Sequence, residues 1–299
     1  MIRDRFLRIR WTSVLTSGVL VAGIGGLTLV GGGAEAAPVA SPTIQMVPNQ
    51  FVRSTGPRAR SSTSAASTSP CWASSNWSGY AVSETSPAGL SCVPASGTAY
   101  TSVTGTWTVP TVTGSFRSTY SAAWVGIDGF TNSDLIQAGT EQDYSFGGAH
   151  YSAWWEILPA AETVIPSITV EPGDVITVSI TKGLGTAWSI TLTDSGNTKT
   201  RHAPQPSFNT VQGYSGPGAS AEWVLEAPEV NGRIATLAQY GSTIFDNGAA
   251  DTASPDLAAG TGGEIVQRNA VVSIPSGPNP ARDGFGIAYG SAPPLAPTS

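Results

Sequence analysis

Apolar and polar residues alternate over several short stretches of the chain, which is the pattern of a β-strand with one buried face. Residues 176–181 have the sequence Ile-Thr-Val-Ser-Ile-Thr, and residues 188–193 have the sequence Trp-Ser-Ile-Thr-Leu-Thr. Residues 103–109 alternate valine, glycine and tryptophan with threonine in the same way. We therefore expect three strands whose apolar side chains face a common core.

Turn-forming residues interrupt these strands at intervals of roughly ten residues. The sequence Glu-Pro-Gly-Asp at 171–174 precedes one strand, and Asp-Ser-Gly-Asn at 194–197 ends another. Further short strands are expected near 241–245, 264–274 and 285–289. Helical periodicity is missing after residue 70, and no repeat of fixed period is visible. The sequence predicts an all-β fold, a sandwich of two antiparallel sheets.

The first 36 residues have the pattern of a secretory signal peptide. Four arginines precede residue 11, an apolar run follows to about residue 30, and Ala-Glu-Ala at 34–36 provides a cleavage site. Residues 37–70 are rich in serine, threonine, alanine and proline, so we expect no fold there. We interpret them as a disordered linker or as a removable pro-segment. Residues 71–299 are then the folded domain.

Cysteine content and charge limit what this domain can do. Cys71 and Cys92 are the only cysteines, and in an exported chain we expect a disulfide between them, worth about 3 kcal/mol in the loop-entropy model. Two cysteines exclude a multi-cysteine zinc site, and the sequence predicts no metal and no cofactor. After residue 70 the chain has seven bases and 18 acids, a net charge of −11. We expect a secreted monomer that binds neither nucleic acid nor membranes and that tolerates acid.

Four other predicted strands place carboxyl or amide groups beside tryptophans on one face. The residues that share these faces are Trp124, Gly126 and Asp128; Leu135, Gln137, Gly139 and Glu141; Ser152, Trp154, Glu156 and Leu158; and Glu222 and Glu226. Such a face is typical of a cleft wall rather than of a core. We assign Trp77, Trp124 and Trp154 to this cleft, and Trp107, Trp188 and Trp223 to the core.

The motifs that the chain lacks narrow the chemistry. It has no Gly-x-Ser-x-Gly, no His-Glu-x-x-His and no phosphate-binding loop, and its only histidines are His150 and His202. A pair of a serine with one of these histidines stays open. Three other interpretations remain: a hydrolase that uses one carboxylate and one amide, a glycoside hydrolase that uses two carboxylates, and a carbohydrate- or peptide-binding sandwich without catalysis.

Six short sequences occur in order between residues 75 and 226. They are Ser75-Asn76-Trp77-Ser78-Gly79-Tyr80, Tyr100–Pro110, Trp124-Val125-Gly126-Ile127-Asp128-Gly129, Ile136-Gln137-Ala138-Gly139, Ala153-Trp154-Trp155-Glu156 and Ala221-Glu222-Trp223-Val224-Leu225-Glu226. Together they resemble the glutamic peptidases, also called eqolisins or the G1 family, and the resemblance extends from about residue 75 to 248. It implies a concanavalin-like sandwich and a secreted endopeptidase that is made as a proenzyme and acts on polypeptides in acid.

The resemblance also implies which residues form the site. Matched by motif, the catalytic pair is Gln137 and Glu222. Substrate-contacting positions fall on Trp77, Trp124, Asp128, Glu141 and Glu156, to which the strand pattern adds Trp154 and Glu226. The chain departs from the family at Glu141, where aspartate is usual, at Ser152, often acidic, and at Leu158, often tyrosine. These departures leave the pair intact and put the subsite preference in question.

Peptide hydrolysis needs an activated water, an oxyanion stabiliser and a proton for the leaving nitrogen. Glu222 can take a proton from water and return it to the amine, and such help is worth about 10²–10⁴ in rate. Gln137 can donate an amide hydrogen to the oxyanion, a contact worth about 10²–10³ in kcat. Glu226 shares a face with Glu222 and is the rival base. We prefer Glu222 because it lies within the Ala-Glu-Trp sequence of the family.

Overall fold

The computed structural model describes residues 42–52, 70–114 and 116–298, and every regular element in these ranges is a β-strand. No long apolar helix of the kind that crosses a bilayer occurs among the residues described. The predicted signal peptide, residues 1–36, lies outside them. The strands are β1 (Ile44–Gln45), β2 (Trp72–Ser74), β3 (Trp77–Ser83), β4 (Ser102–Thr108), β5 (Ala122–Ile127), β6 (Ile136–Ser145), β7 (Gly148–Ile157), β8 (Thr163–Val164), β9 (Val175–Lys182), β10 (Ala187–Asp194), β11 (Phe208–Gly213), β12 (Ser220–Glu226), β13 (Glu229–Val230), β14 (Arg233–Ile234), β15 (Ser242–Ala250), β16 (Gly263–Gln267), β17 (Ala270–Pro278) and β18 (Phe285–Tyr289).

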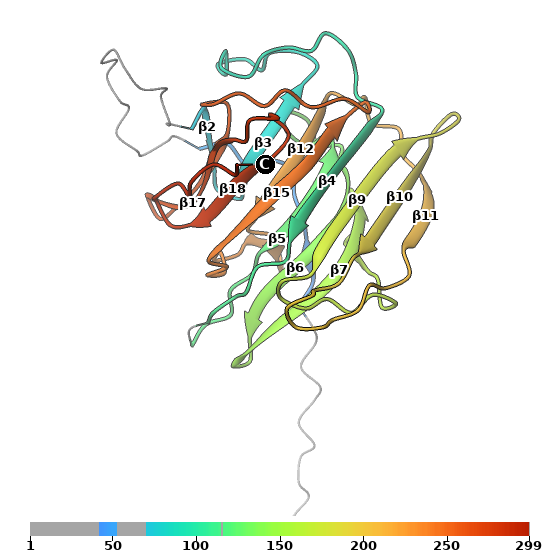
Figure 1. Cartoon of the computed structure of the whole chain (residues 1–299). Helices are drawn as coiled ribbons and strands as arrows, with labels where there is room; N and C mark the ends of the chain where they lie inside the picture. The colour runs from blue at the N-terminus through green and yellow to red at the C-terminus, as the bar shows by residue number, and fades with distance from the viewer. Residues whose placement is uncertain (1–41, 53–69, 115, 299) are drawn as a thin grey trace, which may run out of the picture. The chain divides into compact units, whose positions relative to one another are not determined.

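The strands form two layers that face one another (Figure 1). The first layer has the order β11-β10-β9-β4-β15, and the second has the order β3-β12-β5-β6-β7-β8. The path of hydrogen-bonded strands continues from β15 through β18, β17 and β16 to β3, so the layers are joined along one edge. Their pairs are antiparallel, and β2 pairs with β16 in parallel. The predicted antiparallel sandwich is confirmed, and the join between the layers is a long-range feature that local patterns do not contain.

The first layer follows the alternating pattern that the sequence predicts. In β9, Ile176, Val178 and Ile180 are fully buried, whereas the residues between them are partly exposed. β10 and β4 alternate in the same way, and their apolar side chains meet those of the second layer in the main core. Burial of each large aliphatic side chain stabilises the fold by about 1.5–3 kcal/mol. The main core also contains Trp107, Trp188 and Trp223, as predicted.

The central strands of the second layer, β5 and β12, are buried on both faces. All seven residues of β12 are buried. Its odd-numbered residues, including Trp223, belong to the main core, whereas Glu222, Val224 and Glu226 face away from it. A second apolar cluster, here called the outer cluster, covers that outer face and contains Trp77, Trp124 and Trp154. β5 and β12 therefore have no solvent-exposed face in this structure, whereas β7 has exposed residues near its start.

Cys71 and Cys92 form a disulfide, with their Cα atoms 5.9 Å apart, which confirms the predicted pairing. The bridge lies at the start of β2. The backbone N–H of Cys71 donates to Gly262 O, and β2 pairs with β16 immediately afterwards. The disulfide thus links the start of β2 to the loop between β3 and β4, whereas hydrogen bonds attach β2 to the edge where the two layers join.

Residues 42–52, here called the strap, are folded onto the domain. This differs from the expectation that residues 37–70 have no fold; the remainder of that segment, 37–41 and 53–69, lies outside the described residues. β1 of the strap pairs with β13, Phe51 bridges to Ser74, and Met46 is fully buried. One buried side chain and a series of main-chain hydrogen bonds leave no periodic pattern in a sequence. Composition therefore could not distinguish the strap from the polar residues around it.

Candidate active site

Four residues, here called the polar row, lie side by side across the second layer. Glu156 in β7 is the register partner of Gln137 in β6, Gln137 pairs with Gly126 in β5, and Gly126 pairs with Glu222 in β12. Residues in register share a face, so Glu222 and Gln137 flank Gly126, and Glu156 lies beyond Gln137. Neighbouring strands are about 4.8 Å apart, which places the backbones at 137 and 222 roughly 10 Å from one another. Side chains of this length can approach each other over Gly126.

Gly126 keeps the centre of the polar row open. A Cβ atom at this position would lie 2.9 Å from Cζ3 of Trp124, 3.1 Å from Ile136 O and 3.2 Å from Cβ of Gln137. Contacts this short require a neighbour to move, and the surrounding residues are fully buried. The glycine is therefore needed for the space between the two predicted catalytic side chains.

Gln137 is oriented by its neighbour in the row. Its Nε2 donates to Oε2 of Glu156 over 2.7 Å, whereas its Oε1 is buried and has no hydrogen-bond partner among the described residues. Burial raises the pKa of Glu156 to about 9, and the charge of Glu226 contributes to the rise. The pair fixes the amide so that its oxygen and its second N–H remain for another partner.

Glu222 is fully buried and lacks hydrogen-bond partners. Neither carboxyl oxygen is paired with any residue that the structure describes. Burial raises the pKa of Glu222 well above its ordinary value of 4.5; the nearby Ser220 hydroxyl lowers it, and the charge of Asp128 raises it. An unpaired buried carboxyl group is costly, and such groups are uncommon in native proteins outside functional sites.

Glu226, the rival base, has a different environment. Its Oε1 accepts hydrogen bonds from the backbone N–H of Val47 at 3.0 Å and from Asn76 Nδ2 at 3.3 Å, and its Oε2 accepts one from Trp124 Nε1 at 2.9 Å. Burial raises its pKa to about 8, and these hydrogen bonds oppose the rise. All these hydrogen bonds hold neighbouring groups in place, so Glu226 has a structural role here. Glu222 has free acceptor atoms.

Asp128 follows β5 and is also fully buried. Its carboxylate accepts hydrogen bonds from Asn132 Nδ2, Tyr214 OH and the backbone N–H groups of Gly218 and Ala219. These contacts hold the residues just before β12 against the end of β5, next to the polar row. Substrate contact by Asp128 stays a prediction, and in this structure its carboxylate positions the backbone near Glu222.

Glu141 lies two positions beyond Gly139 on the same face of β6. Its Oε2 accepts a hydrogen bond from the Ser152 hydroxyl over 3.3 Å, and its Oε1 is unpaired within the described chain. Burial raises the pKa of Glu141 well above 4.5, and the charges of Asp143 and Glu162 add to the effect. This group of three acids was not recognised from the sequence, because Glu162 lies in the loop after β7, outside every predicted strand.

The three tryptophans assigned to the cleft are fully buried in the outer cluster. Trp77 and Trp124 meet edge to face, with ring centroids 4.8 Å apart. Trp77 Nε1 donates to Val47 O of the strap over 2.9 Å, whereas the Trp154 indole N–H has no partner among the described residues. The face assignment of these residues was correct. Their complete burial was not expected, and the strap contributes to it.

Asn76 was not identified as a site residue, although it stands in one of the quoted sequences beside Trp77. It is fully buried, and its amide contacts Val47, Pro48 and Gln50 of the strap. Its polarity next to a tryptophan was the only available signal. An asparagine that precedes a strand is usually a turn residue, so the sequence pointed elsewhere.

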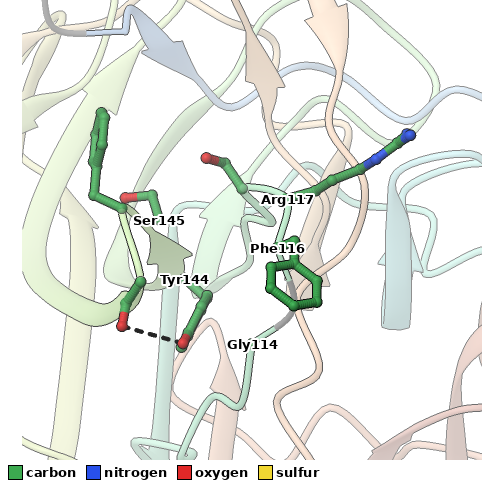
Figure 2. Close-up of a pocket in the computed structure, with 8 residues that line it drawn as sticks. Gly114, Phe116, Arg117, Tyr144 and Ser145 are labelled. Atoms are coloured by element: carbon green, nitrogen blue, oxygen red, sulfur yellow. Dashed lines mark hydrogen bonds between the residues drawn. The ribbon is translucent and has the colours of Figure 1, made fainter.

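Two further features lie away from the polar row. A pocket of 660 Å³ lies between the loop that follows β4 and the β6–β7 turn, and its lining contains none of the predicted site residues. Figure 2 shows Phe116 and Tyr144 in this pocket, with the Arg117 side chain extending away from Tyr144. In the described ranges, Asp174, Asp194 and His202 bring possible ligand atoms within 4.8 Å of one another. His202 Nδ1 forms hydrogen bonds with Asp174 and lies 4.0 Å from Oδ2 of Asp194, contacts that already account for the arrangement.

Known proteins resemble this chain in sequence and in fold. Residues 75–274 match the peptidase A4 family. Aspergillopepsin-2 of Aspergillus niger is 31% identical over 185 residues, which are 52% of this chain and 61% of that protein, so the chain spans less than two thirds of this relative. Two crystal structures of scytalido-glutamic peptidase, each with a transition-state analogue, are 22% identical, cover 72% of this chain and 98% of their own, and give TM-scores of 0.53 and 0.51. These two structures share the fold.

The family match extends over most of the chain and includes both layers of the sandwich and all members of the polar row. The chain therefore belongs to the peptidase A4 family, the glutamic peptidases or eqolisins.

Proposed function

We propose that the protein is an endopeptidase that hydrolyses peptide bonds of polypeptides in acid by direct attack of water. Its catalytic pair is Gln137 and Glu222. Membership of the peptidase A4 family supports the class of reaction and the class of substrate. The observation that carries the residue assignment is the polar row, in which buried, unpaired acceptor atoms of Gln137 and Glu222 flank Gly126.

Glu222 acts as the general base and then as the general acid. Its two oxygens are unpaired, so the ionised carboxylate can accept the proton of a water held over Gly126 on one of them, which leaves the group neutral. After the attack, the same carboxyl group passes the proton to the leaving nitrogen. One residue thereby serves both halves of the reaction.

Gln137 stabilises the oxyanion and positions the water. Its amide nitrogen carries two hydrogens, one of which donates to Glu156. The other is free to donate to the developing oxyanion, and Oε1 is free to accept from the water. Glu156 holds the amide in this orientation and acts as a positioning residue.

The elevated pKa of Glu222 has a consequence for activity in acid. A protonated Glu222 cannot accept a proton from water, and burial favours this form. Entry of water and of substrate amide dipoles lowers the pKa toward its ordinary range, where a fraction of the carboxyl group is ionised in acid. Catalysis therefore needs a more hydrated cleft than the covered one in this structure.

The alternative of a two-carboxylate glycoside hydrolase has less support. Glu156 and Glu222 are the carboxylates of the polar row, and they lie three strands apart, which is roughly 14 Å between backbones. A retaining mechanism requires carboxyl groups about 5–5.5 Å apart. Gln137 lies between the two and already binds Glu156.

We also propose that the protein works outside the cell as a monomer, after removal of residues 1–36. The Cys71–Cys92 disulfide supports an oxidising compartment. N-terminal sequencing of the secreted protein would check the processing step. A mature chain that begins at residue 1 would contradict it.

The proposed activity is tested by digestion of a denatured protein at about pH 2–5, near the carboxyl pKa. The protein is first incubated in acid, and N-terminal sequencing establishes whether the strap has been removed. We expect Glu222→Gln to lower the rate by about 10²–10⁴ and Gln137→Ala to lower it by about 10²–10³. Glu171→Gln, at an exposed turn of the other layer, is the matched control and should leave the rate unchanged. If strap-free protein is inert, or if Glu222→Gln retains full activity, the proposal is wrong.

A further inference from the structure

The segment that leads into β12 is fixed by Asp128. The carboxylate of Asp128 accepts hydrogen bonds from the backbone N–H groups of Gly218 at 2.9 Å and Ala219 at 2.7 Å. It also accepts one from Tyr214 OH at 2.6 Å. The backbone N–H of Asp128 in turn donates to Ser220 O over 3.0 Å. Four hydrogen bonds to one residue therefore hold the backbone that ends at Ser220.

Ser220 is the first residue of β12, and its hydroxyl group has no partner inside the protein. The side chain is fully buried, and its Oγ makes no hydrogen bond with any residue that the structure describes. A buried hydroxyl group without a partner loses its contacts with water and gains none in return, which destabilises the fold. An alanine at this position would avoid that loss. We therefore expect the hydroxyl group to find its partner when the site is charged.

Glu222 lies two positions further along β12 and carries the matching acceptors. Residues two apart on a strand share a face and are about 6.8 Å apart, a distance that a serine and a glutamate side chain can close between them. Both carboxyl oxygens of Glu222 are buried and unpaired within the described chain. A serine hydroxyl group can rotate to suit an acceptor. A donor and an acceptor that both lack partners thus belong to neighbouring side chains.

The groups that face Glu222 in the described part of the chain are neutral or acidic. Its register partners in β3 and β5, which do not ionise, are Ala81 and Gly126. Burial raises the pKa of the Tyr100 and Tyr214 phenols, so both stay neutral in acid. The charge of Asp128 disfavours the ionised form of Glu222, and Glu156 lies three strands away in the polar row. The ionised carboxylate therefore depends on a neutral donor.

Ser220 is the side chain that can supply this donor. A hydrogen bond to a carboxylate favours its ionised form, and hydrogen bonds of this kind are about twice as strong as those between neutral groups. Burial raises the pKa of Glu222 well above 4.5, and the Ser220 hydroxyl acts in the opposite direction. A general base must be ionised to take a proton from water. The hydroxyl group thus favours the form of Glu222 that begins the reaction.

We propose that Ser220 is a positioning residue for the general base, whose hydroxyl group donates to one oxygen of the ionised Glu222 carboxylate and leaves the other oxygen to the water over Gly126. The inference deepens the proposed function and rests on it for the role of Glu222. The serine forms no covalent bond, and its proton stays on Oγ. Its contribution ends when the carboxyl group has taken the proton of the water and is neutral.

Carbon-13 NMR measures the proposed effect without relying on catalysis. The full chain is labelled with glutamate that carries carbon-13 at Cδ, and the signal that is lost in Glu222→Gln identifies the carboxyl carbon of Glu222. We expect Ser220→Ala to raise the pKa read from this signal by about one pH unit, because the variant removes a donor to the charged form. Ser220→Thr keeps the hydroxyl group and should leave the pKa within about 0.3 unit of the native value.

Ser78→Ala is the matched control for the loss of a buried hydroxyl group. Ser78 is fully buried in β3, next to β12, but its Oγ already donates to Gly263 O over 3.0 Å. This variant should leave the pKa of Glu222 unchanged. Ser220→Ala should not lower Tm at about pH 4.5, because it removes a hydroxyl group that has no partner. An unchanged Glu222 pKa in Ser220→Ala, or an equal shift in Ser78→Ala, overturns the proposal.

The pH profile of kcat/KM provides a second readout, measured on protein that has been incubated in acid. The acid limb of this profile reports the ionisation of the base in the free enzyme. Ser220→Ala should therefore lower kcat/KM about tenfold at pH values below the midpoint of the limb and change it little above the midpoint. A residue with a purely structural role would lower kcat/KM by the same factor at every pH, and that result contradicts the proposal.

The failure of this inference can be told apart from the failure of the proposed function. If Ser220→Ala shifts the pKa of Glu222 but the native protein does not hydrolyse protein in acid, the hydrogen bond stands and the peptidase assignment falls. If Glu222→Gln abolishes hydrolysis while Ser220→Ala changes neither the pKa nor the pH profile, the peptidase assignment stands and the role of Ser220 falls.

Discussion

The two layers of the sandwich use the same strand geometry in different ways. In β9 and β10 of the first layer, buried aliphatic residues alternate with partly or fully exposed serines and threonines. In β5 and β12 of the second layer every residue is buried, and the outer face of β12 carries Glu222 and Glu226. The first layer is built for stability. The second layer has a similar apolar inward face. Its outward face also carries carboxyl groups, whose burial costs free energy.

The raised pKa values of the carboxyl groups on the outer face show that burying their ionised form is unfavourable. Burial raises the pKa of Glu156 to about 9 and of Glu226 to about 8, and it raises the pKa of Glu222 well above 4.5. Groups that weaken folding in their ionised form persist where function requires them. The apolar residues of the inward faces therefore stabilise the sandwich. The acidic residues of the outer face are held in place by it for function.

The largest expected effect on stability comes from a substitution in the main core, which the two layers share. Trp223→Ala removes a fully buried indole from the main core and should lower the free energy of unfolding by about 3–5 kcal/mol. Urea denaturation followed by tryptophan fluorescence or circular dichroism measures the change. Ser189→Ala, on the exposed face of β10, should change the free energy by less than about 0.5 kcal/mol. Similar losses for the two variants would mean that the layers do not share one core.

A smaller effect on stability but a large effect on activity is expected at Gly126. The Cβ of Gly126→Ala would press on Trp124 and Gln137, so strap-free protein should lose about 100-fold in kcat. The overpacking should cost about 1–3 kcal/mol in stability. Gly213→Ala in β11 is the matched control, because a Cβ there meets no atom within 4 Å. Full activity of Gly126→Ala would show that the space in the polar row is not needed.

The buried carboxyl groups of the outer face should make the stability of the fold depend on pH. Carboxyl groups with a raised pKa bind a proton more tightly in the folded than in the unfolded chain, so their contribution is complete below about pH 4.5 and is lost as the pH rises through about 8 for Glu226 and about 9 for Glu156. Each such group changes the stability by up to about 1.4 kcal/mol per pH unit in that window. We expect Tm to fall from pH 4.5 to 9.

The variant that sharpens this result is Glu156→Gln. It removes one titrating group from the outer face, so the slope of stability against pH should become shallower between about pH 4.5 and 9. Glu171→Gln, at an exposed turn, should leave the slope unchanged. A Tm that rises with pH over this range would contradict the assigned directions.

Much of the fold was accessible from the sequence because its information is local. The alternation in 176–181 and 188–193 predicted both the strands and their buried faces, and the disulfide followed from two cysteines in a chain predicted to be exported. The edge formed by β16, β17 and β18 was not accessible, because it depends on which distant strands pair. Local patterns show which side chains of a strand are buried, but they do not show which strands it pairs with.

The candidate site divides in the same way. The face shared by Glu222 and Glu226 follows from spacing alone, whereas the polar row requires the order β12-β5-β6-β7, which brings 222, 126, 137 and 156 into register. Asn76 and the strap were missed because their contacts are hydrogen bonds, a short strand pair and one buried side chain between segments that are far apart in the sequence. Such contacts leave no period in the sequence.

The most direct test of the central claim is a double-mutant cycle on strap-free protein in acid. It measures kcat for Gln137→Ala, Glu222→Gln and the double variant against a denatured protein substrate. If the two side chains act on one water over Gly126, the double variant should be about as slow as the slower single variant, because residues that work as a unit are not additive. Independent losses that multiply in the double variant, or native kcat in Glu222→Gln, would contradict the account.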